Sequence, residues 1–249
     1  MSSRVRVRRA WTVADTETIP EGVPDESPGW SAGTRRPNAR TTRANVGRDS
    51  VTDDPKVQSE AVRSRGIRNW ETLEAGEIQK RGIFGFQQVV RRSPRTGRPG
   101  RYQVLHLDDW VNVVAITEDD DVVLIEQYRH GIDRPTLEIP GGLVEPGEDP
   151  AHAAERELLE ETGYAGEPAE LLGRVHPNPA FQTNVCSTYL VRGARRVAEP
   201  DLDPGEDIAV AIHPRSTLDA MVRRGDISHS LVVAAFHWLN LAEAKGLER

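Results

Sequence analysis

Residues 142–164 constrain the fold more than any other part of this chain, because they predict a loop followed by one short helix. Asp149 is a favourable N-cap, Pro150 suits the first helical position, and Gly163 can take the left-handed conformation that ends a helix. At about 100° per residue, one helix face carries small or apolar side chains and should pack on a core. These side chains are Ala151, Ala154, Leu158 and Thr162.

The same helix gathers negative charge beside that face. Glu157 and Glu161 lie one turn apart, with Glu160 on their outer flank. Like charges at this spacing destabilise a helix by about 0.2–0.5 kcal/mol. Arg156 can offset Glu160, but it cannot neutralise Glu157, Glu161 and Glu148 as well. A cluster of hard oxygen ligands without protein cations is what a divalent ion selects. The alternative is an ordinary solvated acidic face.

The spacing of these residues resembles the Nudix box. Gly142 is followed by five residues, Glu148, seven residues and then Arg-Glu-Leu-Leu-Glu-Glu-Thr-Gly-Tyr at 156–164. The resemblance implies that the box binds Mg²⁺ or Mn²⁺ and that the protein hydrolyses a nucleoside diphosphate linked to another moiety. It also implies an α/β/α sandwich with a mixed β-sheet, over roughly residues 65–245.

Charge is distributed unevenly along the chain. The net charge is −7, yet residues 138–170 hold ten acids and a single base, Arg156. The rest of the chain has 29 acids and 31 bases. The acidity therefore belongs to the predicted metal site, and the remainder of the protein does not repel anionic substrates in general.

The chain divides into an expected disordered, charged tail at residues 1–64 and a hydrolase domain at residues 65–249. The tail has scattered prolines and charges and no apolar periodicity. The domain includes N-terminal strands within residues 65–107. Helices are expected at residues 216–224 and 230–245, besides the box helix. Strands are expected at 69–75, 82–92, 102–107, 110–117, 122–128, 136–139, 171–176, 185–191 and 208–212.

Composition excludes some environments and partners. Cys186 is the only cysteine, so no internal disulfide can form. No apolar run is long enough for a membrane span, and the start of the chain does not look like a secretory signal. We expect a soluble cytoplasmic protein without a membrane partner. The Arg-rich residues 4–9 could touch nucleic acid, but acids follow closely, so a nucleic-acid partner is not favoured.

The implied hydrolysis of a pyrophosphate gives each charged residue of the box an expected role. Glu157 and Glu161 are the first choice as metal ligands, because one helical turn points both the same way. Glu160 and Glu148 come next, directly or through water. The carbonyl of Gly141 can complete the shell, because a glycine loop lets backbone oxygen approach an ion. Arg156 is expected to hold Glu160 in place.

Residues outside the box supply candidates for the general base and for substrate binding. Within the acidic segment 201–207, Glu206 is our choice of general base and Asp207 is second, against the alternative of an ordinary acidic turn. Arg129 follows a strand and can grip a terminal phosphate in bidentate fashion, or it can be a surface arginine. The histidines lie in unrelated elements and have no metal-ligand spacing; His229 and His237, at the last helix, are expected to pack.

Three segments resemble ADP-ribose and ADP-sugar pyrophosphatases in particular: residues 127–129, residues 137–142 with Glu138, and residues 147–150. A proline about fifteen residues past the box also fits, at Pro179. Phe181 can stack on a nucleobase or pack in the core. Residues 178–181 read Asn-Pro-Ala-Phe where many relatives have Ser-Pro-Gly, which leaves the sugar and base open.

This resemblance implies Mg²⁺-dependent hydrolysis of a nucleoside diphosphate sugar, with Mn²⁺ as a possible substitute, by a homodimer joined through N-terminal strands. Two alternatives stay open. One is hydrolysis of another pyrophosphate, such as a dinucleoside polyphosphate or an oxidised nucleoside triphosphate. The other is a non-catalytic sensor with the same fold that binds a nucleotide sugar.

Overall fold

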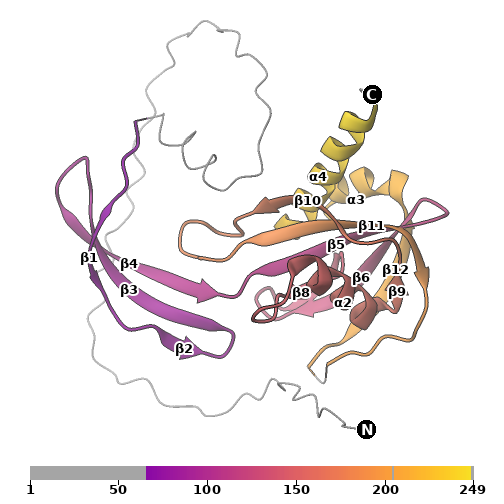
Figure 1. Ribbon diagram of the computed structural model, residues 1–249, viewed down its shortest axis with the longest axis horizontal. Coiled ribbons are helices and arrows are strands. Elements are labelled where there is room, and N and C mark those ends of the chain that lie inside the picture. The colour runs from indigo at the N-terminus through magenta and orange to yellow at the C-terminus, as the bar shows by residue number, and fades with distance from the viewer. Residues whose placement is uncertain (1–65, 204, 248–249) are drawn as a thin grey trace, which may run out of the picture. The chain divides into compact units, whose positions relative to one another are not determined.

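The computed structural model describes residues 66–203 and 205–247, so the tail predicted for residues 1–64 lies outside the described residues. The described chain contains two β-sheets, three α-helices and one 3₁₀ turn (Figure 1). No helix in this part of the chain is long and apolar enough to cross a membrane.

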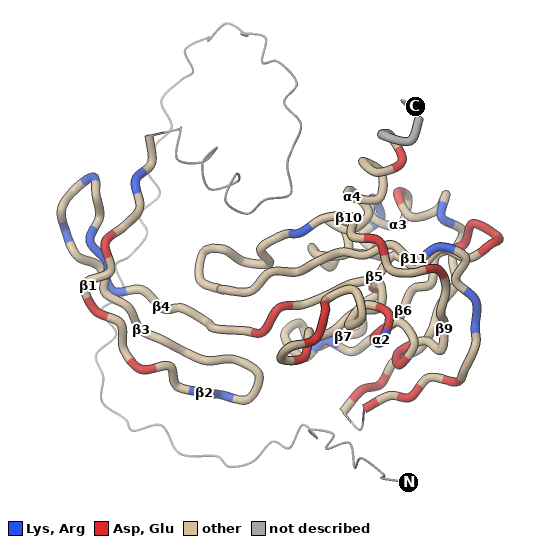
Figure 2. Tube along the Cα trace, in the orientation of Figure 1, with Lys and Arg blue, Asp and Glu red and all other residues tan. Residues whose placement is uncertain are grey.

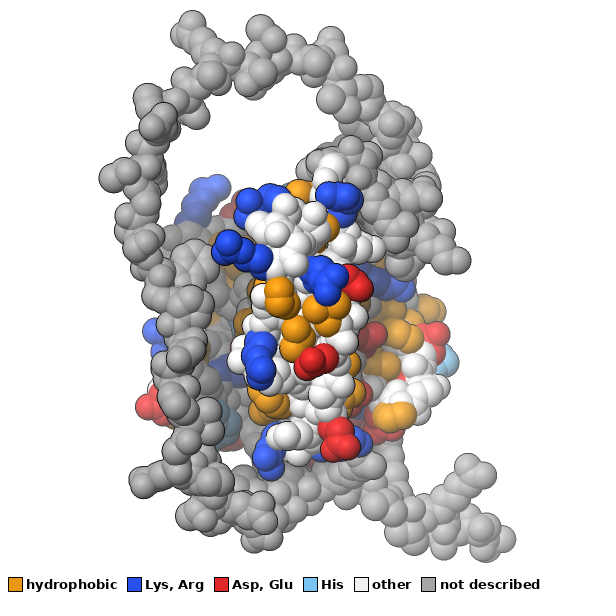
Figure 3. All heavy atoms as spheres, turned by 90° about the vertical axis from the view of Figure 1, so that its left-hand side faces the viewer, with side chains coloured by type: hydrophobic (Ala, Val, Ile, Leu, Met, Phe, Trp, Pro, Cys, Tyr) orange, Lys and Arg blue, Asp and Glu red, His pale blue; other side chains and the backbone are white. Residues whose placement is uncertain are grey.

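The first sheet is antiparallel and has β3 (Phe84–Arg92) at its centre, paired with β1 (Glu71–Ala75), β2 (Gln79–Arg81) and β4 (Pro99–Leu107). The strand predicted over 82–92 is β3, which begins two residues later because residues 82 and 83 form a turn. Gly82 takes the left-handed conformation, with φ of 58°, and reverses the chain between β2 and β3. Figure 3 shows apolar side chains among Lys, Arg, Asp and Glu on the side of this sheet that faces the viewer.

The second sheet has eight strands in the order β10-β11-β5-β6-β12, with three short strands added at its sides. β5 and β11 run parallel and every other pair is antiparallel, so the predicted mixed sheet is confirmed. The bounds are β5 (Trp110–Thr117), β6 (Asp121–Arg129), β7 (Arg134–Glu138), β8 (Gly141–Leu143), β9 (Tyr164–Ala165), β10 (Glu170–Val175), β11 (Cys186–Arg196) and β12 (Ile208–Pro214).

Strands β5 and β6 diverge within this sheet, and this divergence, called the fork below, positions the site. β5 and β6 pair only beside their hairpin turn, where Ala115 faces Val123 and Ile116 faces Val122. Beyond that point β8 pairs with β5, and β7 pairs with β6. The chain from β7 to β8 therefore pairs with both diverging strands, and it places the Gly141-Gly142 turn next to the box helix.

Helices cover both faces of the second sheet. α2 (Pro150–Thr162) packs on one face through a core that includes Val113, Val123 and Leu158. α3 (Leu218–Arg224) and α4 (Ser230–Leu247), preceded by the 3₁₀ turn Arg215–Thr217, cover the other face with a second core. Alternation of side chains along β5 explains the two cores, because Val113 and Val114 point to opposite faces. This is the predicted α/β/α sandwich (Figure 1).

Candidate functional site

The box helix has the ends that the sequence predicted. The Asp149 carboxylate accepts the Ala151 N–H at 2.8 Å, and Pro150 is the first helical residue. Gly163 has φ of 75° and donates its N–H to the Leu159 carbonyl at 2.8 Å. These contacts satisfy backbone groups that a helix leaves unpaired at its ends.

The buried side of α2 is wider than periodicity predicted. Ala154, Leu158 and Thr162 are buried as expected, while Ala153 is buried as well and Ala151 only in part. Glu161 is the larger surprise, because its exposure is only 3%. It was expected beside the packed face, and the structure places it within the buried part of the helix.

The carboxylate of Glu161 has one hydrogen bond that holds it in the fork of the sheet. Its Oε2 accepts the N–H of Gly141 at 2.9 Å. Burial raises the pKa of Glu161 well above its usual value; the Gly141 bond opposes this rise, and the charges of Glu157 and Glu206 add to it. A buried carboxylate among other carboxylates favours a cation as its partner.

Glu157 lies one turn before Glu161 and depends on the second glycine of the turn. A Cβ on Gly142 would lie 2.4 Å from Glu157 Oε1, so this carboxylate can keep its observed position only beside a glycine. Burial raises the pKa of Glu157 to about 7, although the Arg156 charge opposes the shift. The glycine turn and the box carboxylates thus form one packed unit.

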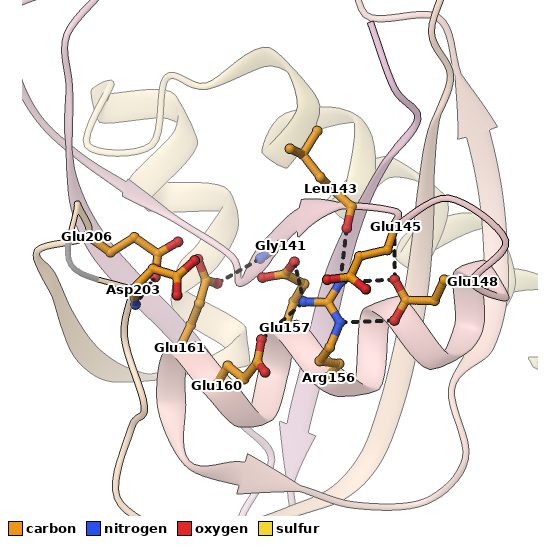
Figure 4. Close-up of polar contacts among 10 residues, drawn as sticks. All are labelled: Gly141, Leu143, Glu145, Glu148, Arg156, Glu157, Glu160, Glu161, Asp203 and Glu206. Atoms are coloured by element: carbon orange, nitrogen blue, oxygen red, sulfur yellow. Dashed lines mark hydrogen bonds and ion pairs between the residues drawn. The ribbon is translucent and has the colours of Figure 1, made fainter. Parts of the chain in front are cut away.

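Arg156 contacts more carboxylates than we predicted. Besides Glu160, at 3.1 Å, its guanidinium contacts Glu148 at 2.9 Å and Glu157 at 2.8 Å, and it donates to the Leu143 carbonyl at 3.0 Å (Figure 4). The predicted contact with Glu160 is present, and the loop before the helix also folds back to bring Glu148 within reach. One positive charge still faces three negative ones.

Glu206 approaches these carboxylates from the segment before β12. Its Oε2 accepts the Asp203 N–H at 2.9 Å, and its own N–H donates to the Asp203 carbonyl at 2.9 Å. Burial raises the pKa of Glu206, the backbone bond from Asp203 opposes it, and the Asp203 and Glu160 charges add to it. Figure 4 shows Glu206 and Asp203 beside Glu161, and Figure 2 shows this acidic segment near α2. Asp207, our second choice of base, is exposed.

Arg129 and Glu138, predicted separately, are partners in the structure. Arg129 Nε donates to Glu138 Oε1 at 2.8 Å, and Nη2 donates to Oε2 at 2.7 Å. The Thr136 hydroxyl also donates to Oε1, at 2.5 Å. The carboxylate of Glu138 is buried, whereas the side chain of Arg129 is 41% exposed. Glu138 therefore holds one edge of the guanidinium and leaves the Nη1 end open for another ligand.

Pro179 and Phe181 lie in the loop between β10 and β11, and both are exposed. The loop is closed by N–H groups of Phe181 and Gln182, which donate to the Asn178 carbonyl. The Phe181 carbonyl accepts the Leu105 N–H of β4 at 2.7 Å. The exposed ring of Phe181, at 41%, leaves the predicted stacking role sterically possible.

The donor set fits a hard divalent cation. Glu157 and Glu161 are largely removed from water, their pKa values are raised, and Glu161 is not among the contacts of Arg156. Within the described residues, no three His, Cys, Asp or Glu side chains already surround a common point. Glu161 accepts the Gly141 N–H, and Glu157 accepts a hydrogen bond from Arg156. Binding of an ion by Glu157 and Glu161 would therefore require their carboxylates to turn from these partners.

Comparison with known proteins decides the family. A family profile described as the NUDIX domain matches residues 108–244, which is more than half of the chain. The chain belongs to the Nudix family of hydrolases. The matched range contains the glycine turn, α2 and Glu206, so the Nudix domain carries all of the carboxylates described above.

The alignment with this chain spans most of the length of two relatives. A methanol dehydrogenase activator of Bacillus methanolicus is 33% identical over 59% of this chain and 80% of its own. An ADP-ribose pyrophosphatase of Mycobacterium tuberculosis is 29% identical over 67% of this chain and 81% of its own. A solved structure of an ADP compounds hydrolase has a TM-score of 0.64 at 20% identity, over 73% of this chain and 97% of its own, which supports the fold.

Proposed function

We propose that this Nudix hydrolase cleaves the pyrophosphate bond of ADP-ribose or a related nucleoside diphosphate sugar in an Mg²⁺-dependent reaction. The products would be a nucleoside monophosphate and a sugar phosphate. The observation that carries the proposal is the buried pair Glu157 and Glu161, whose pKa values are raised beside Glu206. Relatives named ADP-ribose pyrophosphatase, from M. tuberculosis and Bacillus subtilis, support this class of substrate.

The proposed metal ligands are the carboxylates of the box and one backbone oxygen. Glu157 and Glu161 would be direct ligands, and Glu160 and Glu148 would bind directly or through water. The Gly141 carbonyl would complete the shell. When bound, Mg²⁺ supplies charge neutralisation of phosphate oxygens and a more acidic water. Arg156 would keep Glu148, Glu157 and Glu160 in one arrangement while this happens.

Protein side chains would perform the remaining steps. Glu206 would accept a proton from the attacking water, for which a raised pKa is useful. Arg129 would present its open Nη1 end to a phosphate while Glu138 holds the other edge. The exposed ring of Phe181 would stack on the base, next to Pro179 in the same loop.

A substrate panel tests the activity. Purified protein is incubated with ADP-ribose, other nucleoside diphosphate sugars, a dinucleoside polyphosphate and an oxidised nucleoside triphosphate, each with Mg²⁺ or with a chelator. We expect a nucleoside monophosphate and a sugar phosphate from a nucleotide sugar, only with Mg²⁺. Hydrolysis of the polyphosphate or triphosphate alone would favour the second substrate class, which relatives named 8-oxo-dGDP phosphatase and putative 8-oxo-dGTP diphosphatase also support.

Two matched variants test the assignment of Glu206 as the general base. Glu206→Gln should lower kcat by about 100-fold or more while KM changes little, because general-base catalysis contributes about 10²–10⁴-fold. Asp207→Asn, one residue on and exposed, should leave kcat unchanged. Equal effects of both variants would contradict the assignment. A sensor would instead bind a nucleotide sugar calorimetrically without turning it over.

The first sheet supports a further proposal about assembly and domain organisation. Trp70, Ile78, Ile83 and Tyr102 are large apolar side chains that lie exposed at or beside its strands. Residues 65–249 would act as one hydrolase domain whose N-terminal strands pair two copies. Light scattering of purified protein would give a dimer mass, and a monomer at micromolar concentration would contradict the assembly.

A further inference from the structure

His229 is a polar residue that the expected reaction leaves without a role. It lies just before α4, and its carbonyl accepts the N–H groups of Val232 and Val233, both at 3.1 Å. The start of α4 is also tied to β5, because Asn112 Nδ2 donates to the Leu231 carbonyl at 3.4 Å. These contacts fix the backbone of His229 against the sheet.

One atom of the His229 ring is unexplained by packing. Nδ1 is buried and has no hydrogen-bond partner. Such atoms are rare in native proteins, and each calls for a reason. The nearest acidic atom is Glu138 Oε2, at 4.0 Å. In ligand-free enzymes, hydrogen bonds that matter in the reaction are often long and shorten when substrate binds.

Glu138 has room for this additional donor. Its Oε1 accepts two hydrogen bonds, from Arg129 Nε and the Thr136 hydroxyl, while Oε2 accepts one, from Arg129 Nη2. A carboxylate oxygen can accept two, so Oε2 has an acceptor site left for His229 Nδ1. Burial lowers the pKa of His229, which keeps its ring neutral near pH 7 and able to donate from one nitrogen.

The contacts form a path through the sheet. His229 belongs to the α4 side, Glu138 ends β7 and Arg129 ends β6. Arg129 is near enough to Glu161 of α2 for the carboxylate to raise the pKa of the guanidinium, after the larger effect of Glu138. The path therefore runs from the α4 side of the sheet to the carboxylates of the Nudix box.

We propose that His229 is a positioning residue: through Glu138, it orients the Arg129 guanidinium toward the phosphate groups of the substrate. This inference rests on the proposed function, in which Arg129 contacts a phosphate. A ring that only filled space would not need a buried nitrogen facing a carboxylate. Sequence reasoning missed this role, because 91 residues separate Glu138 from His229 and no spacing rule connects them.

The first test needs no metal, and it is made with and without inorganic pyrophosphate as a phosphate probe, because the contact of Nδ1 with Glu138 is long in the ligand-free protein. NMR measures the exchange of the Arg129 Nε–H proton with water, with Arg129→Ala identifying the signal. We expect exchange about tenfold faster in His229→Leu, and near-native exchange in His229→Asn, whose amide can replace the Nδ1 donor. His229→Phe keeps the ring without nitrogen and serves if the leucine variant does not fold. His237→Leu, an exposed histidine of α4, is the control.

Kinetics with the substrate found by the panel give the second test. His229→Leu should lower kcat/KM about tenfold, mainly through KM, because a misplaced guanidinium binds phosphate less well. In an Arg129→Ala background the same substitution should have no further effect. A packing residue would lower kcat/KM equally in both backgrounds. Unchanged Nε–H exchange in both apolar variants overturns the inference, whereas an inactive wild-type protein with altered exchange overturns only the proposed function.

Discussion

Replacing the two glycines of the turn separates stability from activity, because each would clash with a different kind of neighbour. A Cβ on Gly142 would lie 2.4 Å from Oε1, 2.5 Å from Cδ and 2.7 Å from Oε2 of Glu157. A Cβ on Gly141 would instead meet the backbone of β5, at 2.4 Å from the Val111 carbonyl oxygen and 2.8 Å from Asn112 Cα.

The Gly142→Ala variant should fold and lose activity. Ordinary contact begins near 3.4 Å, so the Glu157 carboxylate must move by about 1 Å, which a flexible side chain can do. A misplacement of that size costs about 100-fold in rate, or about 2.7 kcal/mol in the activation free energy. Mg²⁺ affinity should fall as well, because Glu157 is a proposed ligand.

The Gly141→Ala variant should lose stability first. The strand backbone cannot rotate away, and overpacking of this kind costs about 1–3 kcal/mol. For a domain of this size that corresponds to a Tm lower by roughly 5 °C. Gly131→Ala is the control, because its added Cβ meets no atom within 4 Å and its backbone is not left-handed.

Thermal unfolding, Mg²⁺ calorimetry and hydrolysis rates of the three variants form the assay. We expect a rate loss in Gly142→Ala at near-native Tm, and a lowered Tm in Gly141→Ala. Wild-type rate and Mg²⁺ affinity in Gly142→Ala would refute the claim that the glycine turn shapes the carboxylate site.

Three other predictions concern single side chains. Arg156→Lys should lower the free energy of unfolding by about 2 kcal/mol in a urea titration, because a lysine cannot contact three carboxylates from one planar group; an unchanged midpoint would contradict it. Burial raises the pKa of Glu138, but hydrogen bonds from Arg129 and Thr136 lower it more, so the net pKa lies below the usual 4.5. The stability from its charged form is thus complete above about pH 4.5 and is lost as pH falls through the folded pKa, so the unfolding free energies of wild type and Glu138→Gln should converge on acidification. Burial raises the pKa of Cys186 to about 12, so iodoacetamide at pH 8 should modify the thiol only after unfolding, as mass spectrometry would show.

Local features of the site could be predicted from the sequence because they depend on neighbours in the chain. The caps at Asp149 and Gly163 follow from the conformations that these residues favour, and the structure has both. The strand at 110–117 was predicted with its observed bounds, since a long apolar run between turn residues marks a buried strand. β8 and β9 were missed, because two or three residues carry no periodicity.

Features that depend on distant pairing could not be predicted in this way. Burial of Glu161 follows from the fork between β5 and β6, which brings the Gly141 N–H to its carboxylate. The pair formed by Arg129 and Glu138 follows from the pairing of β6 with β7. Hydrophobic patterning gives the faces of strands but not their partners, so Arg129 was chosen for its chemistry and Glu138 from the resemblance, without their contact being foreseen.

Manganese binding measured by electron paramagnetic resonance tests the central claim most directly: the crowded oxygens of α2 exist to hold a divalent cation. Wild-type protein should take up Mn²⁺ and release it to excess Mg²⁺, and Glu161→Gln should bind at least about tenfold more weakly. Glu155→Gln, an exposed residue of the same helix, should bind like wild type. Absence of Mn²⁺ binding in the wild type, or equal binding in wild type and Glu161→Gln, would contradict the account.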